Sequence, residues 1–421
     1  MHEDHVRALE ELVATQNRWR GRECINLIAS ENTLSRRARA LLGSDFGHRY
    51  AEGHPGERYY EGTQHIDVVE TLAKEQMRKI FKCTRAEVRC VSGTNANEAL
   101  FCATIDDGDI VVVNSVPAGG HISHQRMGVV GRYAKKIINY PLTEDGYRVD
   151  VGKTKDLIRE QNPKVLVFGK SLFLFPEPLK ELVPVCREAK IKVIYDGAHV
   201  LGLIGGCEFQ DPLGDGVDAL VGSTHKTFFG PQRGVILSNL PDEDWKRIDR
   251  KVFPGTHSNH HLDTLPPLLM TAYEFAEFGP VYAKQVISNA KALGRGLDKQ
   301  GLEVAAKELG FTASHQVAVN VKKHGGGTRV AMLLRTNDII CNQNLLPGDT
   351  TKELANPSGI RLGTQEMTRV GMKEAEMDHI AELMKAAIVD GRSVKDEVNK
   401  FRERFQHVQY SFDNLAVPAS R

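Results

Sequence analysis

Two charged residues follow apolar runs in a pattern that could support chemistry on an amine. Lys226 lies in GSTHKTFFGPQRG (222–234), just after the apolar run DALV, and His225 precedes it. Asp196 ends another run, KVIYD. In an α/β sheet, ligands bind at the carboxyl ends of the strands, so the amine and the carboxylate are expected to lie at one edge of a sheet.

A third run, EVRCV (87–91), ends at a short hydroxyl and glycine segment that opens the helical stretch NANEALF: Ser92, Gly93 and Thr94. The free N–H groups and the dipole of a helix N-terminus both favour an anion. This segment therefore predicts a phosphate site.

A phosphate site, a buried carboxylate and a lysine together suit pyridoxal phosphate. Lys226 would bind the cofactor as a Schiff base, and Asp196 would keep the pyridine nitrogen protonated so that the ring acts as an electron sink. Ser223 and Thr224 would add hydroxyl groups near the phosphate or the lysine. Each feature alone has a plainer explanation, as an N-cap, a turn residue or a solvated lysine. Their combination at successive strand ends favours the cofactor.

The elements that must position these residues alternate between strand and helix. Runs rich in Val and Ile predict strands at 87–91, 109–113, 164–168, 192–195, 218–222 and 234–238, with helical periodicity between most of them. This alternation predicts an α/β fold with a mostly parallel sheet covered by helices on both faces. A long helical region at about 263–300 is followed by a smaller α+β region. We expect an N-terminal helical arm (1–20), a large domain (21–265), and a linking helix with a small C-terminal domain (266–421).

Composition excludes several classes of protein. The chain has 55 basic and 54 acidic residues, for a formal net charge of +1, so no clustered positive field indicates nucleic-acid or membrane binding. No apolar stretch approaches the roughly 20 residues of a membrane span, and the N-terminus lacks a signal-peptide core. The seven cysteines form no CxxC pair, so neither a disulfide framework nor a zinc ribbon is indicated. We expect a cytoplasmic protein without a metal.

Several long motifs resemble the serine hydroxymethyltransferase family, in its archaeal form, over nearly the whole chain. They are INLIASEN (25–32), HRYAEGHPGERYYEG (48–62), GGHISH (119–124), YDGAHVLGL (195–203), GSTHKTFFGPQRG (222–234) and SGIRLGTQEMTRVG (358–371). The resemblance implies the fold type I, aspartate aminotransferase-like architecture of pyridoxal phosphate enzymes. It also implies a homodimer whose active sites are shared between subunits.

The resemblance assigns the cofactor residues by position. Lys226 matches the Schiff-base lysine, His121 the imidazole that stacks on the ring, and Asp196 the partner of the pyridine nitrogen. The remaining cofactor contacts by resemblance are Ser92, Gly93 and Thr94 for the phosphate, Gly255 offered to the phosphate by the other subunit, and Ser171, His199, Ser223 and His225 around the ring and the lysine.

The substrate residues follow in the same way. Arg361 resembles the arginine that binds the substrate carboxylate, for which a planar fork gives two parallel charge-assisted bonds. Glu52 resembles the acid–base carboxylate between amino acid and pterin. Ser30, Tyr50 and Tyr60 would help to hold the amino acid, and Gly120, Glu52 and Asn344 would contact the pterin. The implied reaction is reversible serine–glycine interconversion with transfer of a one-carbon unit to tetrahydrofolate or tetrahydromethanopterin.

Some positions depart from the family pattern. The segment after the lysine reads GPQRG where GPRGG is common, which places Gln232 and Arg233 there. Lys170 stands where a glycine is common and is expected to add charge close to the site, and NQN (342–344) replaces NKN near the pterin loop. An altered reaction therefore stays open, as in a threonine aldolase, a threonine transaldolase or a lyase of secondary metabolism. A non-catalytic binding or scaffold protein is the other alternative, against which Lys226, Asp196 and His121 argue.

Overall fold

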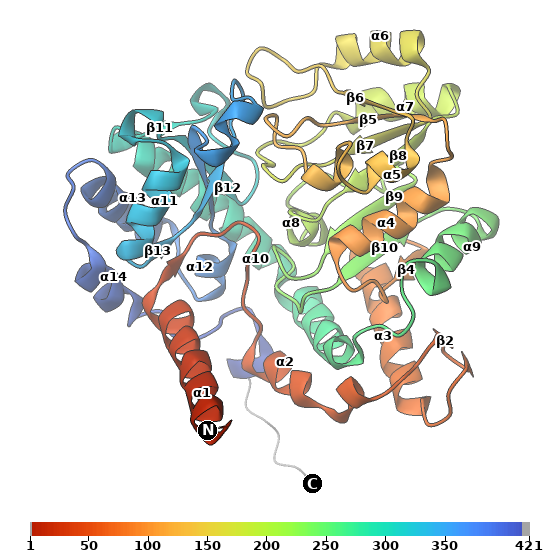
Figure 1. The fold of residues 1–421 in the computed structure, drawn as a ribbon, viewed down its shortest axis with the longest axis horizontal. Coiled ribbons are helices and arrows are strands. Elements are labelled where there is room, and N and C mark those ends of the chain that lie inside the picture. Colours follow the sequence, from red (N-terminus) through yellow and green to blue (C-terminus); the bar gives the residue numbers. More distant parts are fainter. Residues whose placement is uncertain (1, 415–421) are drawn as a thin grey trace. The chain divides into compact units, whose positions relative to one another are not determined.

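The computed structural model describes residues 2–414, and the chain divides into two compact units. The large unit contains residues 30–284 and the segment that begins at Tyr410. The small unit contains the described residues up to Ala29 together with residues 285–409. Figure 1 follows the chain through its elements by colour.

A seven-stranded sheet forms the centre of the large unit, in the order β4-β10-β9-β8-β7-β5-β6. Strands β5 to β9 pair in parallel, whereas β10 runs antiparallel to both of its neighbours. The mostly parallel sheet predicted from the sequence is thus confirmed. Its strands are β4 (Arg85–Glu87), β5 (Ile110–Val113), β6 (Lys136–Asn139), β7 (Val165–Phe168), β8 (Lys192–Asp196), β9 (Ala219–Ser223) and β10 (Gly234–Ser238).

Both faces of this sheet are buried. Val111 and Val113 belong to one hydrophobic cluster with Leu100 of α4, while Val112, which points to the opposite face, is buried as well. Near-continuous apolar strands of this kind are typical of a parallel sheet covered on both sides. The helices of this unit are α2 (Arg36–Ala40), α3 (Gln64–Phe81), α4 (Gly93–Thr104), α5 (Val130–Tyr133), α6 (Val151–Gln161), α7 (Leu179–Glu188), α8 (Leu201–Gly205) and α9 (Asp242–Arg250). A short hairpin joins β2 (Gly53–His54) to β3 (Glu57–Arg58).

The small unit has its own four-stranded antiparallel sheet in the order β11-β12-β15-β14. Its strands are β11 (Glu303–Val304), β12 (Gln316–Asn320), β14 (Asn342–Asn344) and β15 (Gly359–Gly363), and β1 (Ile25–Asn26) pairs separately with β13 (Ile339–Ile340). The helices are α1 (His2–Arg18), α11 (Gly327–Thr336), α12 (Gln365–Arg369), α13 (Glu374–Ile388) and α14 (Lys395–Arg402). Helix α10 (Leu265–Lys299) runs from the large unit into the small one, changing units after Lys284.

One predicted strand is displaced in the structure, and one strand of the structure was not predicted. The strand expected at 87–91 is β4 at Arg85–Glu87, and β6 at Lys136–Asn139 was not predicted. Residues 88–91 are not paired as a strand, and the Val88 carbonyl accepts hydrogen bonds from the Arg233 side chain instead. Strand β6 lies at the sheet edge with no fully buried residue, so it lacks the apolar run on which the prediction depended.

Candidate active site

The predicted cofactor residues of the large unit lie where its parallel strands end. Asp196 is the last residue of β8 and Ser223 the last residue of β9, and these two strands are neighbours in the sheet. Ser171 follows the end of β7, and its N–H donates to the Gly119 carbonyl at 2.6 Å. The carboxyl edge of the sheet therefore carries polar groups from three adjacent strands.

A tight loop between β9 and β10 fixes the backbone around Lys226. The Thr224 N–H donates to the Arg233 carbonyl at 3.0 Å, and Thr224 Oγ1 donates to the Pro231 carbonyl at 2.5 Å. From outside the loop, Asn32 Nδ2 donates to the Lys226 carbonyl at 2.7 Å. The main chain that carries the half-buried lysine is thus held from both sides.

The neighbours of Lys226 are also held in place. Burial and the adjacent Lys226 ammonium lower the pKa of His225 to about 4, so its imidazole is neutral near neutral pH. Thr227 Oγ1 donates to the carbonyl of His199 at 2.9 Å, which ties the lysine loop to the segment after β8. His199 itself is buried.

Asp196 is a buried carboxylate with three hydrogen-bond donors. Oδ2 accepts from Asn97 Nδ2 at 2.7 Å and lies 3.0 Å from His124 Nε2, while Oδ1 accepts from the Ala198 N–H at 3.0 Å. Burial alone would raise the pKa of Asp196, but the hydrogen bond from His124 and the charges of the nearby histidines lower it further than burial raises it. The group is therefore ionised throughout the physiological pH range, as a partner of a protonated ring nitrogen must be.

His121 lies next to this carboxylate network. Its Nδ1 accepts from the Ser123 N–H at 3.2 Å, so the ring is held at the start of a short 3-10 turn. The rings of His121 and His124 meet edge to face with their centroids 6.0 Å apart. The imidazole expected to stack on the cofactor is thus connected through His124 to Asp196.

The start of α4 has the close packing that a phosphate cradle needs. Ser92 caps the helix, since its Oγ accepts from the Asn95 N–H at 3.1 Å. A Cβ on Gly93 would lie 2.4 Å from Ser223 Oγ, and a Cβ on Gly234 would lie 2.1 Å from the Ser92 carbonyl oxygen. A side chain at Gly234 would meet main-chain atoms of the helix start, and one at Gly93 would displace the Ser223 hydroxyl, so the helix start approaches β9 and β10 closely. A helix N-terminus at the strand edge that bears Asp196 fits a pyridine cofactor with a phosphate.

The loop with Glu52 carries two exposed aromatic residues. Tyr50 and Tyr60 are 53% and 43% exposed, and their ring centroids are 5.3 Å apart. Desolvation and the adjacent Glu52 carboxylate raise the pKa of Tyr60. Nη1 of Arg58 donates to the carbonyls of Ala51 and Gly53, the residues on either side of Glu52. A carboxylate and two phenols are therefore gathered on a loop whose main chain is fixed.

Arg361 and Asn344 belong to the small unit. Arg361 lies in the central part of β15, where burial lowers its pKa to about 10, and its Nε donates to Asn342 Oδ1 at 3.3 Å. Asn344 ends β14, and its Nδ2 donates to the Leu345 carbonyl at 2.6 Å. Both residues therefore lie on neighbouring strands of the small sheet.

Comparison with known proteins gives the same family over most of the chain. A family model described as serine hydroxymethyltransferase matches residues 5–384. The serine hydroxymethyltransferase of Archaeoglobus fulgidus is 49% identical over 93% of this chain and 90% of its own length. That of Thermoplasma acidophilum is 48% identical over 93% of both chains. This chain belongs to the serine hydroxymethyltransferase family.

A solved structure shows the same fold. L-threonine transaldolase from Pseudomonas fluorescens, in its internal aldimine state, superposes with a TM-score of 0.88 at 28% identity, covering 99% of this chain and 96% of that one. The fold type I architecture and a pyridoxal phosphate-dependent transferase activity follow for this member of the serine hydroxymethyltransferase family.

Among the described residues, no group of three His, Cys, Asp or Glu side chains is placed to hold a metal ion. None of the helices between residues 2 and 414 has both the length and the apolar character of a membrane span.

Two of the departures from the family pattern, Lys170 and Arg233, have structural explanations. Lys170 was expected to add charge close to the site, but its ammonium donates to the Tyr147 carbonyl at 2.7 Å and lies 3.5 Å from the buried Glu177 carboxylate. Its charge is therefore compensated by Glu177. Arg233 is fully buried, and its guanidinium binds main-chain carbonyls and His260.

Sequence reasoning missed residues that hold the predicted ones. His124 and Asn97 both contact Asp196, yet neither was singled out. His124 is the second histidine of GGHISH, and Asn97 lies one helical turn after Gly93 in NANEALF, so each signal was present in a quoted motif.

The structure also places the other predicted residues. Gly120 is buried, with no space for a Cβ because one would lie 2.1 Å from the Asn114 carbonyl oxygen. Ser30 is half-buried in a turn at the start of the large unit. Gly255 is exposed in the segment Lys251–Thr256.

Proposed function

We propose that the enzyme interconverts serine and glycine reversibly and transfers the one-carbon unit to a reduced pterin, tetrahydrofolate or tetrahydromethanopterin. The observation that carries this proposal is that the Glu52 carboxylate lies near the Tyr60 phenol, whose pKa it raises, on a loop whose main chain is fixed. Cleavage of a β-hydroxy amino acid to a stable aldehyde needs no such group at the pterin, whereas one-carbon transfer requires a proton to be moved there.

The carboxyl edge of the large sheet would hold the cofactor. The helix start at Ser92, Gly93 and Thr94 would bind the phosphate, and Asp196 would hold a proton on the ring nitrogen. Pyridoxal phosphate, when bound, supplies an electron sink for the charge that develops at the amino acid α-carbon. Lys226 would hold the cofactor covalently, with His121 against the ring. Further contacts would come from Ser171, His199, Ser223 and His225, and from Gly255 of the other subunit.

The amino acid and the pterin would be bound by a second set of residues. Arg361 would bind the substrate carboxylate with two parallel hydrogen bonds, assisted by Ser30 and Tyr50. Glu52 would exchange a proton with the serine hydroxyl or with the pterin, beside Tyr60. Gly120 and Asn344 would contact the pterin.

We also propose a homodimer in which the subunits share their active sites. Tyr50 and Tyr60 are unusually exposed for large aromatic residues, as expected for groups that a second subunit covers. Helix α1 has no buried residue, although Val6, Leu9 and Val13 form an apolar stripe along it. A second copy would cover both surfaces. Membership of the family also supports a cytoplasmic location.

A threonine transaldolase activity is the second candidate, because a protein of that name has this fold at 28% identity. The deciding experiment measures glycine formed from L-serine with each pterin, in parallel with cleavage of L-threonine and L-allo-threonine. We expect conversion of serine to depend on one of the pterins and to exceed the cleavage of threonine. Threonine cleavage without any pterin-dependent conversion of serine would assign the enzyme to the aldolase or transaldolase class.

A further inference from the structure

We propose that Arg58 is a positioning residue for Glu52, and that a buried chain of side chains, Arg58–Glu70–His260–Arg233, holds Arg58 and joins the Glu52 loop to the loop of Lys226. This inference deepens the proposed function, since it rests on Glu52 being the acid–base group of one-carbon transfer. All members of the chain lie in the large unit.

Arg58 fixes the main chain on both sides of Glu52. Its Nη1 donates to the Ala51 carbonyl at 2.7 Å and to the Gly53 carbonyl at 2.8 Å. The Glu52 carbonyl in turn accepts from the Tyr59 N–H at 3.2 Å. Three consecutive carbonyls around Glu52 are therefore hydrogen-bonded, and the direction in which the Glu52 side chain leaves the loop is set by Arg58.

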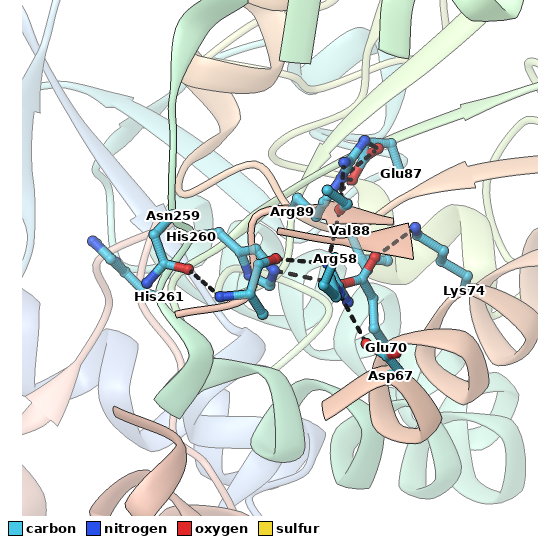
Figure 2. A network of polar contacts seen from close by, with 12 residues as sticks. Arg58, Asp67, Glu70, Lys74, Glu87, Val88, Arg89, Asn259, His260 and His261 are labelled. Carbon is cyan, nitrogen blue, oxygen red and sulfur yellow. Dashed lines mark hydrogen bonds and ion pairs between the residues drawn. The ribbon is translucent and has the colours of Figure 1, made fainter. Parts of the chain in front are cut away.

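The guanidinium of Arg58 is itself held by buried acids. Its side chain is 2% exposed; Nη2 donates to Glu70 Oε2 at 2.6 Å, and Nε donates to Asp67 Oδ1 at 2.8 Å. Figure 2 shows the Glu70 carboxylate between Arg58 and Lys74, whose Nζ donates to Oε1 at 2.6 Å. Burial raises the pKa of Glu70, but the nearby His260 ring and the charges of Lys74 and Arg58 lower it well below the usual range. Glu70 is thus a permanent anion that anchors Arg58.

His260 connects Glu70 to Arg233. Nη2 of Arg233 donates to His260 Nδ1 at 2.9 Å, so Nδ1 is the acceptor and the ring proton resides on Nε2. His260 Nε2 faces Glu70 Oε2 at 3.4 Å. Burial lowers the pKa of His260 to about 4, so the neutral tautomer selected by Arg233 persists at neutral pH.

Arg233 uses all of its donors within the protein. Besides His260, they bind the carbonyls of Val88 and His261 and the hydroxyl of Thr264. Its own main chain pairs with Thr224, two residues before Lys226. Arg233 therefore lies in the lysine loop and binds residues of the segment 260–264.

Asn259, the residue before the segment 260–264, forms a second link to the Glu52 loop. Asn259 Oδ1 accepts from the Ala51 N–H at 3.0 Å, and Asn259 Nδ2 donates to the Arg49 carbonyl at 3.0 Å. Residues 49 and 51 are thus connected to Asn259, which directly precedes the segment that Arg233 holds. Apolar residues of similar volume could stabilise such a core as well as buried ions do, whereas the Arg58 guanidinium reaches two carbonyls through Nη1 and two carboxylates through Nε and Nη2 at once.

The test compares two reactions of one protein. Arg58→Lys keeps the charge but cannot bind both carbonyls and both acids. We expect it to lower the kcat of pterin-dependent serine conversion by about 10- to 100-fold, as for a group displaced by about 1 Å. Cleavage of L-allo-threonine should stay within about threefold of wild type, because it does not need Glu52. Arg402→Lys is the matched control: Arg402 is also buried and binds carbonyls, all within the small unit. It should change the ratio of the two rates little.

A double variant separates positioning from general damage to the fold. If Arg58 acts through Glu52, Arg58→Lys in a Glu52→Gln background should lower serine conversion by less than about twofold beyond Glu52→Gln alone. Losses that multiply would overturn the proposal, and so would an equal loss of both reactions in Arg58→Lys.

Hydrogen–deuterium exchange tests the chain itself without any activity. Arg58→Lys and Arg233→Lys should both increase exchange in a peptide covering residues 49–60, while peptides of β7 and β8 keep their protection. Unchanged exchange at 49–60 in Arg58→Lys would overturn the positioning role, and unchanged exchange in Arg233→Lys would remove Arg233 from it. A wild type without pterin-dependent activity would refute the proposed function, whereas the exchange result would still decide whether the chain holds the loop.

Discussion

Gly234→Ala should disturb the predicted phosphate cradle without touching a catalytic group. A Cβ at this position would lie 2.1 Å from the Ser92 carbonyl oxygen and 3.0 Å from the Gly93 nitrogen. Both are backbone atoms at the start of α4, so relief requires the helix start to move away from β10. Overpacking of this kind costs about 1–3 kcal/mol. If the displacement falls on the cradle, the Kd of pyridoxal phosphate should rise by about 5- to 150-fold.

The assay is a titration of the apoenzyme with pyridoxal phosphate, followed by its absorbance. Gly222→Ala is the matched control, because a Cβ on Gly222 would overpack the neighbouring strand β9 against the Leu201 side chain instead, at 2.6 Å. This control should lower the melting temperature and leave the Kd close to that of wild type. Equal Kd values for Gly234→Ala and wild type, or an equal rise in both variants, would refute the assignment of the helix start as the phosphate site.

Three further predictions concern single contacts. Arg361→Lys should raise the Kd of serine by about 10- to 150-fold, since an ammonium loses a charge-assisted bond of about 1.5–3 kcal/mol. Calorimetry on the enzyme with bound cofactor measures this Kd, and an unchanged affinity would remove Arg361 from the substrate site. Asp196→Asn must place an amide NH₂ against the N–H of Ala198 or against Asn97 and His124. We therefore expect the apoenzyme to lose about 1.5–3 kcal/mol of stability. A variant apoenzyme that melts at the wild-type temperature would contradict this network of hydrogen bonds. The pKa of His260 in the folded state is about 4, below its unfolded value, so its contribution to stability is complete above about pH 6.5. That contribution is lost as the pH falls toward 4, by up to about 1.4 kcal/mol per pH unit. His260→Asn keeps an acceptor for Arg233 and should make the melting temperature depend less on pH in that window, whereas parallel curves for variant and wild type would show that His260 does not titrate this way.

The buried strands of the large unit were predictable because each is a short apolar run. β7, β8, β9 and β10 lie within a residue or two of the predicted runs. The long helix α10 was recognised by its periodicity in the same way. By contrast, β1 pairs with β13 across more than 300 residues of sequence, a long-range contact that no local pattern contains.

The buried arginines could not be anticipated, since arginine counts as an exposed residue in any pattern of apolar and polar positions. Arg89, inside EVRCV, binds Glu87 and Asp249, and the fully buried Arg233 binds the Val88 carbonyl that a strand pairing would have used. The motifs did indicate Lys226, Asp196 and Ser92 as residues at the ends of runs. The motifs did not indicate which residues hold these side chains, because His124 and Asn97 are distant from Asp196 in the sequence and contact it only in the folded structure.

The buried position of Arg233 has a consequence for exchanging parts between relatives. A loop that carries glycine at this position would leave the carbonyls of Val88 and His261 without their donors, and His260 would lose the partner that selects its tautomer. Conversely, Arg233 grafted alone into such a relative would bury a cation without its acceptors. Glu70, His260 and Arg233 should therefore change together during divergence, and a chimera should keep its function only when all three come from the same parent.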